Sequence, residues 1–223
     1  MKIITAIITL FLVGPFCRGQ DIENEYELKN DTLRVIVKEC KDNRLFNNYY
    51  DIHGIKVANY YQIIDSLTIF LNKDNISDKV IVLSPVSQEN QDTLPCELKP
   101  KKRVLLVFVS TSGRNSYRID FLNENVILNT YDYQYNPFRG MKRTKNGFRI
   151  LFEFGSIINC MYEFDFVCKK AEIMLQRRTY QCFNKGNPDL SEKKTENFNG
   201  QKYKLRNLNL NEFIHIPNLL EKK

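Results

Sequence analysis

The sequence lacks most of the residues on which metal centres and nucleophilic active sites depend. It contains no tryptophan and only two histidines, His53 and His215, which excludes a multi-histidine metal centre. The C-x-x-C spacing of zinc knuckles and redox-active dithiols is missing. Glycine-rich phosphate loops and the G-x-S-x-G nucleophile elbow are missing as well. The sequence alone therefore does not reveal a biochemical activity.

A strong excess of one charge is also lacking. The formal net charge is +7, from 33 basic and 26 acidic residues that are spread along the chain. Such a small and dispersed surplus does not identify a nucleic-acid-binding protein, so we expect no nucleic-acid partner. Hydrophobic residues make up 43% of the chain, which argues against a disordered protein.

Residues 1–19 have the organisation of a secretory signal peptide. Lys2 precedes the apolar run Ile3–Val13, which is too short to span a membrane. Cleavage after Gly19 would leave a small residue at the last position of the leader. We therefore expect a periplasmic or secreted protein. No later segment approaches the roughly 18 apolar residues of a transmembrane helix, so we expect a soluble mature chain.

Cysteine usage fits export without defining a disulfide pattern. Cys17 lies in the leader, and a lipid-modified Cys17 is disfavoured by the bulky Phe16 before it. Five cysteines remain, and an odd number leaves at least one free thiol in an oxidising compartment; they are Cys40, Cys96, Cys160, Cys168 and Cys182. If Cys160 and Cys168 share a strand they lie about 26 Å apart and cannot form a disulfide. Two alternatives remain open for the five cysteines: they are buried free thiols, or some of them form disulfides in other pairings.

Alternating apolar and polar residues predict three consecutive antiparallel strands near the C-terminal half. They cover residues 148–154, 158–168 and 171–180, with a turn at Gly155-Ser156 and a two-residue hairpin loop at Lys169-Lys170. In this register Phe164 faces Leu175 and Phe166 faces Ile173 on an aromatic side. On the other, charged side Glu163 faces Gln176, with Arg178 diagonal to Glu163. Arg177 and Arg178 point to opposite faces, so at most one of them is buried.

Further strands are predicted at 66–71, 79–83, 104–109, 117–122 and 126–128. The run 104–109 is almost continuously apolar, which is typical of a strand buried on both faces. The stretch 57–67 fits either a helix or a strand, and 202–216 is a weak strand or a docking segment. We expect a mainly β protein: a single-domain antiparallel curved sheet or sandwich with at most one or two short helices. The domain covers 32–216, after a flexible segment 20–31 and before a polar tail 217–223.

The loop after residue 71 is the best candidate for a ligand site. Alternate oxygen ligands of a tight loop can surround a calcium ion, and here Asn72, Asp74 and Asp78 supply side chains while Ile76 supplies its carbonyl. Phe70 stands where the first acidic ligand is expected, so the pattern is a weak, degenerate calcium loop. The alternative is a turn whose Asp and Asn side chains bond to their own backbone. No other cofactor is implied.

This loop and its flanks resemble the D-L-N-x-D-x-x-x-D strand-loop-strand unit of the FG-GAP/VCBS-like repeat, in the segment SLTIFLNKDNISDKVIVLSP. The chain from Ser66 to Tyr180 further resembles a family of exported bacterial proteins of unknown function, seen particularly in Bacteroidetes. The likeness runs through KKRVLLVFVSTSG, SYRIDFLNENVIL, NPFRG and NGFRILFEFGSIINCMYEFDFVCKKAEIMLQRRTYQ. Residues 159–161 depart from the family, which usually carries tryptophan there. The resemblance implies a β-rich fold and an envelope or secreted location, and it brings no catalytic residues.

Three other constellations have simpler structural explanations. His53 beside Asp51 fits a solvent-facing loop better than a catalytic pair. Glu163 and Asp165 share a strand face, as general acid-base pairs can, but solvated carboxylates on a sheet are common. The basic run 99–103 can attract anions or protect a strand edge from pairing.

We therefore expect an exported, non-enzymatic binding or interaction protein, monomeric, with an unknown protein or glycan partner in the bacterial envelope or extracellular space. No catalytic or cofactor-binding residues are assigned. The alternatives are a periplasmic immunity or inhibitor protein and a secreted hydrolase that uses His53 or the pair Glu163 and Asp165.

Overall fold

The chain folds into β-sheets in the computed structural model. The structure describes residues 25–29, 32–36, 49–52, 55–58, 61–71, 74, 76–85, 102–111, 117–130, 135–169, 172–198 and 203–217. These ranges form thirteen strands and the short 3-10 helices η3 and η4, and they contain no α-helix. The prediction of a mainly β fold is confirmed.

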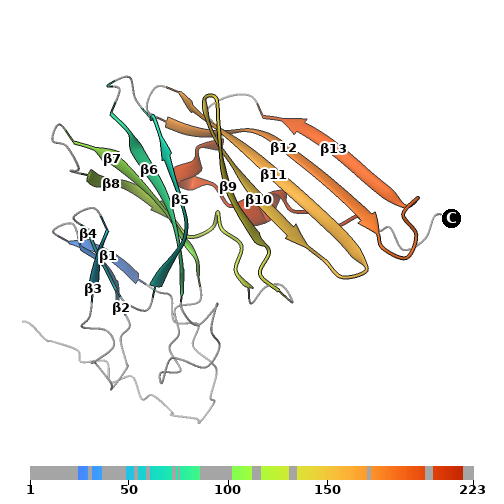
Figure 1. The fold of residues 1–223 in the computed structure, drawn as a ribbon, viewed down its shortest axis with the longest axis horizontal. Coiled ribbons are helices and arrows are strands. Elements are labelled where there is room, and N and C mark those ends of the chain that lie inside the picture. The colour runs from blue at the N-terminus through green and yellow to red at the C-terminus, as the bar shows by residue number, and fades with distance from the viewer. Residues whose placement is uncertain are drawn as a thin grey trace, which may run out of the picture.

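The C-terminal half forms a five-stranded antiparallel sheet in the order β13-β12-β11-β10-β9 (Figure 1). The strands are β9 (Phe138–Thr144), β10 (Gly147–Phe154), β11 (Ile158–Lys169), β12 (Glu172–Asn184) and β13 (Ser191–Asn197). Strands that are consecutive in the sequence are neighbours in the sheet because short turns join them. The alternating phenylalanines of β10 and β11 are buried on one face, as their spacing predicted; they are Phe148, Phe152, Phe154, Phe164 and Phe166.

A second antiparallel sheet has the order β5-β6-β7-β8. Its strands are β5 (Tyr61–Ile69), β6 (Asp78–Pro85), β7 (Val104–Ser110) and β8 (Tyr117–Asn123). The residues from Val104 to Phe108 are fully buried, which confirms a strand covered on both faces. The ambiguous stretch before residue 67 is part of β5, in keeping with its many β-branched side chains.

A third, small sheet has the order β1-β2-β4-β3. It consists of β1 (Glu25–Lys29), β2 (Thr32–Ile36), β3 (Tyr49–Ile52) and β4 (Ile55–Ala58), and β2 pairs with β4 in parallel. The segment 20–31, which we expected to be flexible, contains β1. Ile52 and Val57 are buried against the β5–β8 sheet.

The β5–β8 sheet is the middle layer because its two faces belong to two different cores. One face, with Val80, Val82, Leu105 and Val107, joins the aromatic face of the five-stranded sheet in the main core. The other face packs with the small sheet and contributes Ile81, Leu83, Leu106 and Phe108. The inner face of the five-stranded sheet is therefore covered.

The C-terminal segment lies across that inner face (Figure 1). It contains η3 (Leu205–Asn207) and η4 (Leu210–Phe213), whose Leu205 and Leu210 are fully buried. The hydroxyl of Tyr162 bonds to the backbone of His215, which anchors the end of the segment to β11. The predicted segment 202–216, which is described from Tyr203 on, docks through 3-10 turns and an isolated bridge between Met174 and Lys204.

The predicted pairing of β11 with β12 is wrong, and so is one predicted strand. Lys169 pairs with Glu172, so the chain reverses one residue later than expected and Phe166 faces Leu175 and not Ile173. Phe164 faces Arg178 and not Leu175, and Glu163 faces Thr179 and not Gln176. The hairpin lacks the Asn-Gly or Asp-Gly pair that would mark its turn, so the sequence offered no local signal for the register. Residues 126–128, predicted as a strand, lie in and just after a bend, and their side chains are buried.

Cys160 and Cys182 face each other on β11 and β12 and form a disulfide. Cys168 is a free, half-buried thiol. Cys40, Cys96 and the predicted leader 1–19 lie outside the described residues. Within the part of the chain that is described, no helix has the length and apolar character needed to cross a membrane.

Candidate functional site

The predicted calcium loop is partly within the described residues. Asn72 lies outside them, whereas Asp74, Ile76 and Asp78 are placed. Asp74 is exposed and accepts the N–H of Ile76 at 2.8 Å, which is the turn geometry we gave as the alternative. No group of three or more His, Cys, Asp or Glu side chains with metal-binding geometry occurs among the described residues.

Asp78 is fully buried and its two carboxylate oxygens accept bonds from the protein itself. One oxygen accepts the N–H of Leu71 at 2.7 Å. The other accepts the N–H of Ser110 at 2.9 Å and its hydroxyl at 3.3 Å. Asp78 therefore joins the base of the β5–β6 loop to the end of β7.

The other sequence candidates are separated in space or lie outside the described residues. His53 is among the residues that the structure does not describe, as are residues 99–101 of the basic run. Arg103 is fully buried and bonds to Ser84, Thr130 and the carbonyl of Leu128. Arg103 thus takes part in packing between loops, and it does not add to the surface charge that was expected for the basic run 99–103.

A β-bulge in β12 brings polar side chains together on the open face of the five-stranded sheet. The register between β11 and β12 shifts after the pair Phe166–Leu175, and Asp165 then pairs with Arg177. Gln176 is the extra residue, and both Gln176 and Arg177 are exposed. Such a bulge re-aims the side chains that follow it. Without it, Arg177 would lie opposite Phe164 on the core face.

The same bulge places Arg178 on the inner face, opposite Phe164. Its guanidinium bonds to Glu196 of β13 and to the carbonyl of Phe213. Arg177 and Arg178 therefore point to opposite faces as predicted, and both are paired. The face that each one occupies differs from the prediction, because Arg178 had been placed beside Glu163.

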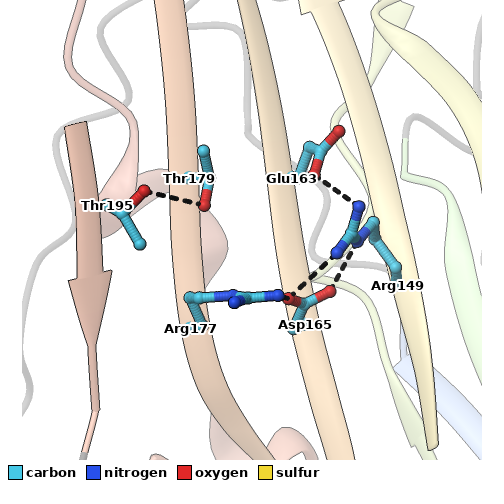
Figure 2. A network of polar contacts seen from close by, with 6 residues as sticks. All are labelled: Arg149, Glu163, Asp165, Arg177, Thr179 and Thr195. Carbon is cyan, nitrogen blue, oxygen red and sulfur yellow. Dashed lines mark hydrogen bonds and ion pairs between the residues drawn. The ribbon is translucent and has the colours of Figure 1, made fainter. Parts of the chain in front are cut away.

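Arg149, Glu163, Asp165 and Arg177 form a continuous ion-pair network across β10, β11 and β12 (Figure 2). Nε of Arg149 lies 2.5 Å from Oδ1 of Asp165, and Nη1 lies 2.5 Å from Oε2 of Glu163. Nε and Nη2 of Arg177 lie 2.8 and 2.5 Å from Oδ2 of Asp165. Asp165 is only 8% exposed, so this carboxylate orients two guanidinium groups.

The pKa shifts in the network show that the carboxylate of Asp165 is held in its ionised form. Burial raises the pKa of Asp165, but the hydrogen bonds from Arg149 and Arg177 outweigh it, and the pKa lies below its ordinary value. The hydrogen bond to Asp165 raises the pKa of Arg149. Asp165 therefore stays ionised at neutral pH, and its oxygens hold arginines. This arrangement suits binding better than proton transfer.

A depression of about 270 Å³ opens beside the network. The turn between β9 and β10 forms one wall and the bulge forms another; the polar lining is Thr144, Lys145, Asn146, Arg149, Asp165, Gln176 and Arg177. The sequence analysis named Asp165, Gln176 and Arg177 and did not connect them with Thr144, Lys145, Asn146 or Arg149. The available signal was the switch of apolar positions in β12 from odd numbers (Ile173, Leu175) to even numbers (Tyr180, Cys182), which indicates an extra residue between them.

A larger depression of about 400 Å³ lies between β8 and η3. Three of its polar side chains, those of Asn123, Glu124 and Arg206, are engaged within the protein. The amide of Asn123 donates to the carbonyls of Leu205 and Leu208, and Arg206 pairs with Asp120 while lying over the ring of Phe121. These contacts fix the C-terminal segment against β8.

The remainder of the open face carries ordinary surface groups with one exposed apolar side chain. Thr179 and Thr195 lie 3.3 Å apart between β12 and β13 (Figure 2). Arg139 pairs with Glu153 at 3.0 Å. Met161 is 47% exposed on β11.

The chain matches no known protein family, no curated protein and no solved structure.

Proposed function

We propose that the chain is an exported, non-enzymatic binding protein of the cell envelope or extracellular space. The leader-like residues 1–19 support export, and so does the disulfide between Cys160 and Cys182, because disulfides persist mainly in oxidising compartments. We further propose that the partner binds on the open face of the five-stranded sheet.

The charge distribution on that face carries the proposal. Its carboxylates Glu153, Glu163 and Asp165 each lie within ion-pair distance of an arginine. Lys142 and Lys193 lie on the same face by register. No carboxylate of the described residues forms a salt bridge with either lysine. The acidic groups are thus neutralised within the face while basic groups remain, which favours an acidic partner.

Site-specific photo-crosslinking in the producing cells tests this function. A photo-reactive residue replaces Met161 on the open face in one variant and Ile216 on the C-terminal segment in the other. The two positions are matched in exposure, at 47% and 48%, and lie on opposite sides of the sheet. We expect a defined adduct from position 161 and none from position 216, in an extracytoplasmic chain that begins at Gln20. Equal labelling from both positions, or a cytoplasmic chain with its leader intact, would contradict the proposal.

A further inference from the structure

The depression at the bulge presents unused hydrogen-bond donors. A guanidinium group carries five N–H donors, and Asp165 engages only Nε and Nη2 of Arg177. Among the described residues nothing bonds to Nη1 of Arg177. Lys145 lies on the opposite wall, in the β9–β10 turn, and is exposed. Two cations with available donors therefore border the same space.

The acceptor side of the depression is already occupied. Both oxygens of Asp165 accept guanidinium bonds, from Arg149 at 2.5 Å and from Arg177 at 2.8 Å. The lining contains Lys145, Arg149 and Arg177 against the single carboxylate of Asp165. The depression thus attracts an anion, and its charged donors match a planar or tetrahedral oxyanion.

The uncharged residues of the lining indicate the chemical class of the ligand more closely. Thr144, Asn146 and Gln176 offer a hydroxyl and two amides, each of which both donates and accepts hydrogen bonds, as sugar hydroxyls require. Val167 adds an apolar contact. The volume of about 270 Å³ lies just below the roughly 300–1,000 Å³ of pockets for drug-sized ligands. One sugar residue is the appropriate size, and the open side leaves room for a chain to continue.

The β-bulge gives an independent reason to regard this place as a binding site. It leaves an extra residue, Gln176, in β12, and it directs Gln176 and Arg177 together toward the depression. Bulges of this kind are concentrated at functional sites because they re-aim side chains at a cost in regular pairing.

We propose that the depression binds an acidic sugar residue, whose carboxylate or sulfate group lies between Arg177 and Lys145. The inference rests on the proposed function and deepens it by naming the class of ligand. Asp165 is a positioning residue, since it holds Arg149 and Arg177 in place. Thr144, Asn146 and Gln176 receive the sugar hydroxyls.

Heteronuclear NMR titration of the full mature chain tests the proposal with four probes: glucuronic acid, glucose 6-sulfate, glucose and inorganic sulfate. The acidic sugars are expected to shift the backbone amides of Asn146 and Gln176. Glucose and sulfate alone are expected to bind at least about tenfold more weakly, because each lacks half of the contacts. Binding of inorganic sulfate as tight as that of glucose 6-sulfate would reveal a simple anion site and overturn the proposal.

Matched variants locate the binding. Arg177→Gln is expected to weaken the affinity for glucuronic acid by about tenfold, since a charged hydrogen bond is lost. Arg118→Gln makes the same charge change on β8 of the other sheet, at an exposed residue, and is expected to have no effect. The amide spectrum of each variant reports whether it is folded. Equal losses in both variants, or no binding by the folded wild-type chain, would refute the proposal.

The two proposals fail separately. An adduct from position 161 without sugar binding would retain the binding function and reject the acidic sugar. Sugar binding at Asn146 and Gln176 without an adduct would retain the saccharide site and reject the wider partner surface.

Discussion

Asp65 and Met141 join two sheets through one hydrogen bond: the backbone N–H of Met141 in β9 donates to the Asp65 carboxylate of β5 at 2.6 Å. Asp65 follows a register shift in β5, which brings its side chain to the edge of the five-stranded sheet. The contact occupies a backbone donor at the edge of β9 that another strand would otherwise be able to pair with. The contact also explains why position 140 is a glycine, because Gly140 has φ +113° and an added Cβ would lie 3.2 Å from Oδ2 of Asp65.

Replacing Gly140 with alanine is expected to destabilise this junction. A side chain at this φ is strained, and we expect Gly140→Ala to lower the free energy of unfolding by about 1–3 kcal/mol. Urea denaturation measures the change. Gly186→Ala is the control because Gly186 does not have a left-handed φ and its added Cβ meets only the side chain of Asn184. Equal destabilisation by the two substitutions would show that the junction does not depend on Gly140.

The disulfide in the five-stranded sheet should contribute measurably to stability. Cys160 and Cys182 are separated by 22 residues, and closing a loop of this length stabilises a fold by about 3 kcal/mol in the chain-entropy account. We expect the double variant Cys160→Ser, Cys182→Ser to lose about that amount in urea denaturation. A chain isolated from the extracytoplasmic fraction should also show the Cys160–Cys182 peptide pair in non-reducing mass spectrometry. Its absence there would contradict this disulfide.

The strands were predictable because burial on one face imposes a period of two, which is visible in β10 and β11. The pairing of β11 with β12 was not predictable to the same degree. A single extra residue, Gln176, exchanges the faces of Arg177 and Arg178, and its effect depends on tertiary packing around Asp165. The C-terminal segment was equally difficult, since it docks through the backbone contacts of Phe213 and His215 and carries no strand-like alternation.

The candidate site likewise combines residues that could be predicted from the sequence with residues that could not. The alternation of β11 predicts Asp165 on the wet face of the sheet, but the predicted register puts Arg178, and not Arg177, on that face. Arg149, the partner of Asp165, belongs to a strand whose alternation had been explained by the core, and the turn residues Lys145 and Asn146 had no pattern of their own. Only the folded hairpin brings these three segments to one depression.

Asp78 should matter for folding even if calcium does not bind to its loop. Replacing Asp78 with alanine removes the acceptor for the N–H groups of Leu71 and Ser110, and each buried unsatisfied donor costs about 1–3 kcal/mol. We therefore expect a loss of about 2–6 kcal/mol in urea denaturation. We also expect excess EDTA to leave the Tm of the wild-type chain unchanged, because both Asp78 oxygens are already bonded. A fall of Tm in EDTA that calcium reverses would instead establish the metal site predicted from Asn72, Asp74, Ile76 and Asp78.

Cys168 should react slowly although it is a free thiol. Burial, together with the nearby charge of Asp78, raises its pKa to about 11. At pH 8 only about 0.1% of such a thiol is thiolate, and the thiolate is the reactive form. We expect iodoacetamide to modify Cys168 at least about a hundredfold more slowly in the folded chain than in urea. Mass spectrometry of the Cys168 peptide separates this thiol from the other cysteines, and rapid modification in the folded state would contradict the raised pKa.

The Asp165 network predicts how stability responds to acid. Burial acts to raise the pKa of Asp165, the bonds from Arg149 and Arg177 lower it more, and the folded-state pKa is therefore depressed. A depressed carboxyl pKa contributes stability that is fully present above the unfolded value of about 3.9 and is lost as the pH falls through the folded value. Asp165→Asn should therefore reduce the slope of unfolding free energy against pH below about pH 4.

The control for this pH dependence is Glu212→Gln, at an exposed position in η4. Urea denaturation at pH values from about 7 down to about 2.5 gives the slopes. The Glu212→Gln chain should keep the wild-type slope. The Asp165→Asn chain should have a lower free energy of unfolding than wild type at neutral pH, and that free energy should fall less than in wild type as the pH is lowered. An unchanged acid slope in Asp165→Asn would mean that the arginines do not stabilise the ionised carboxylate, and the bulge would then have no electrostatic role.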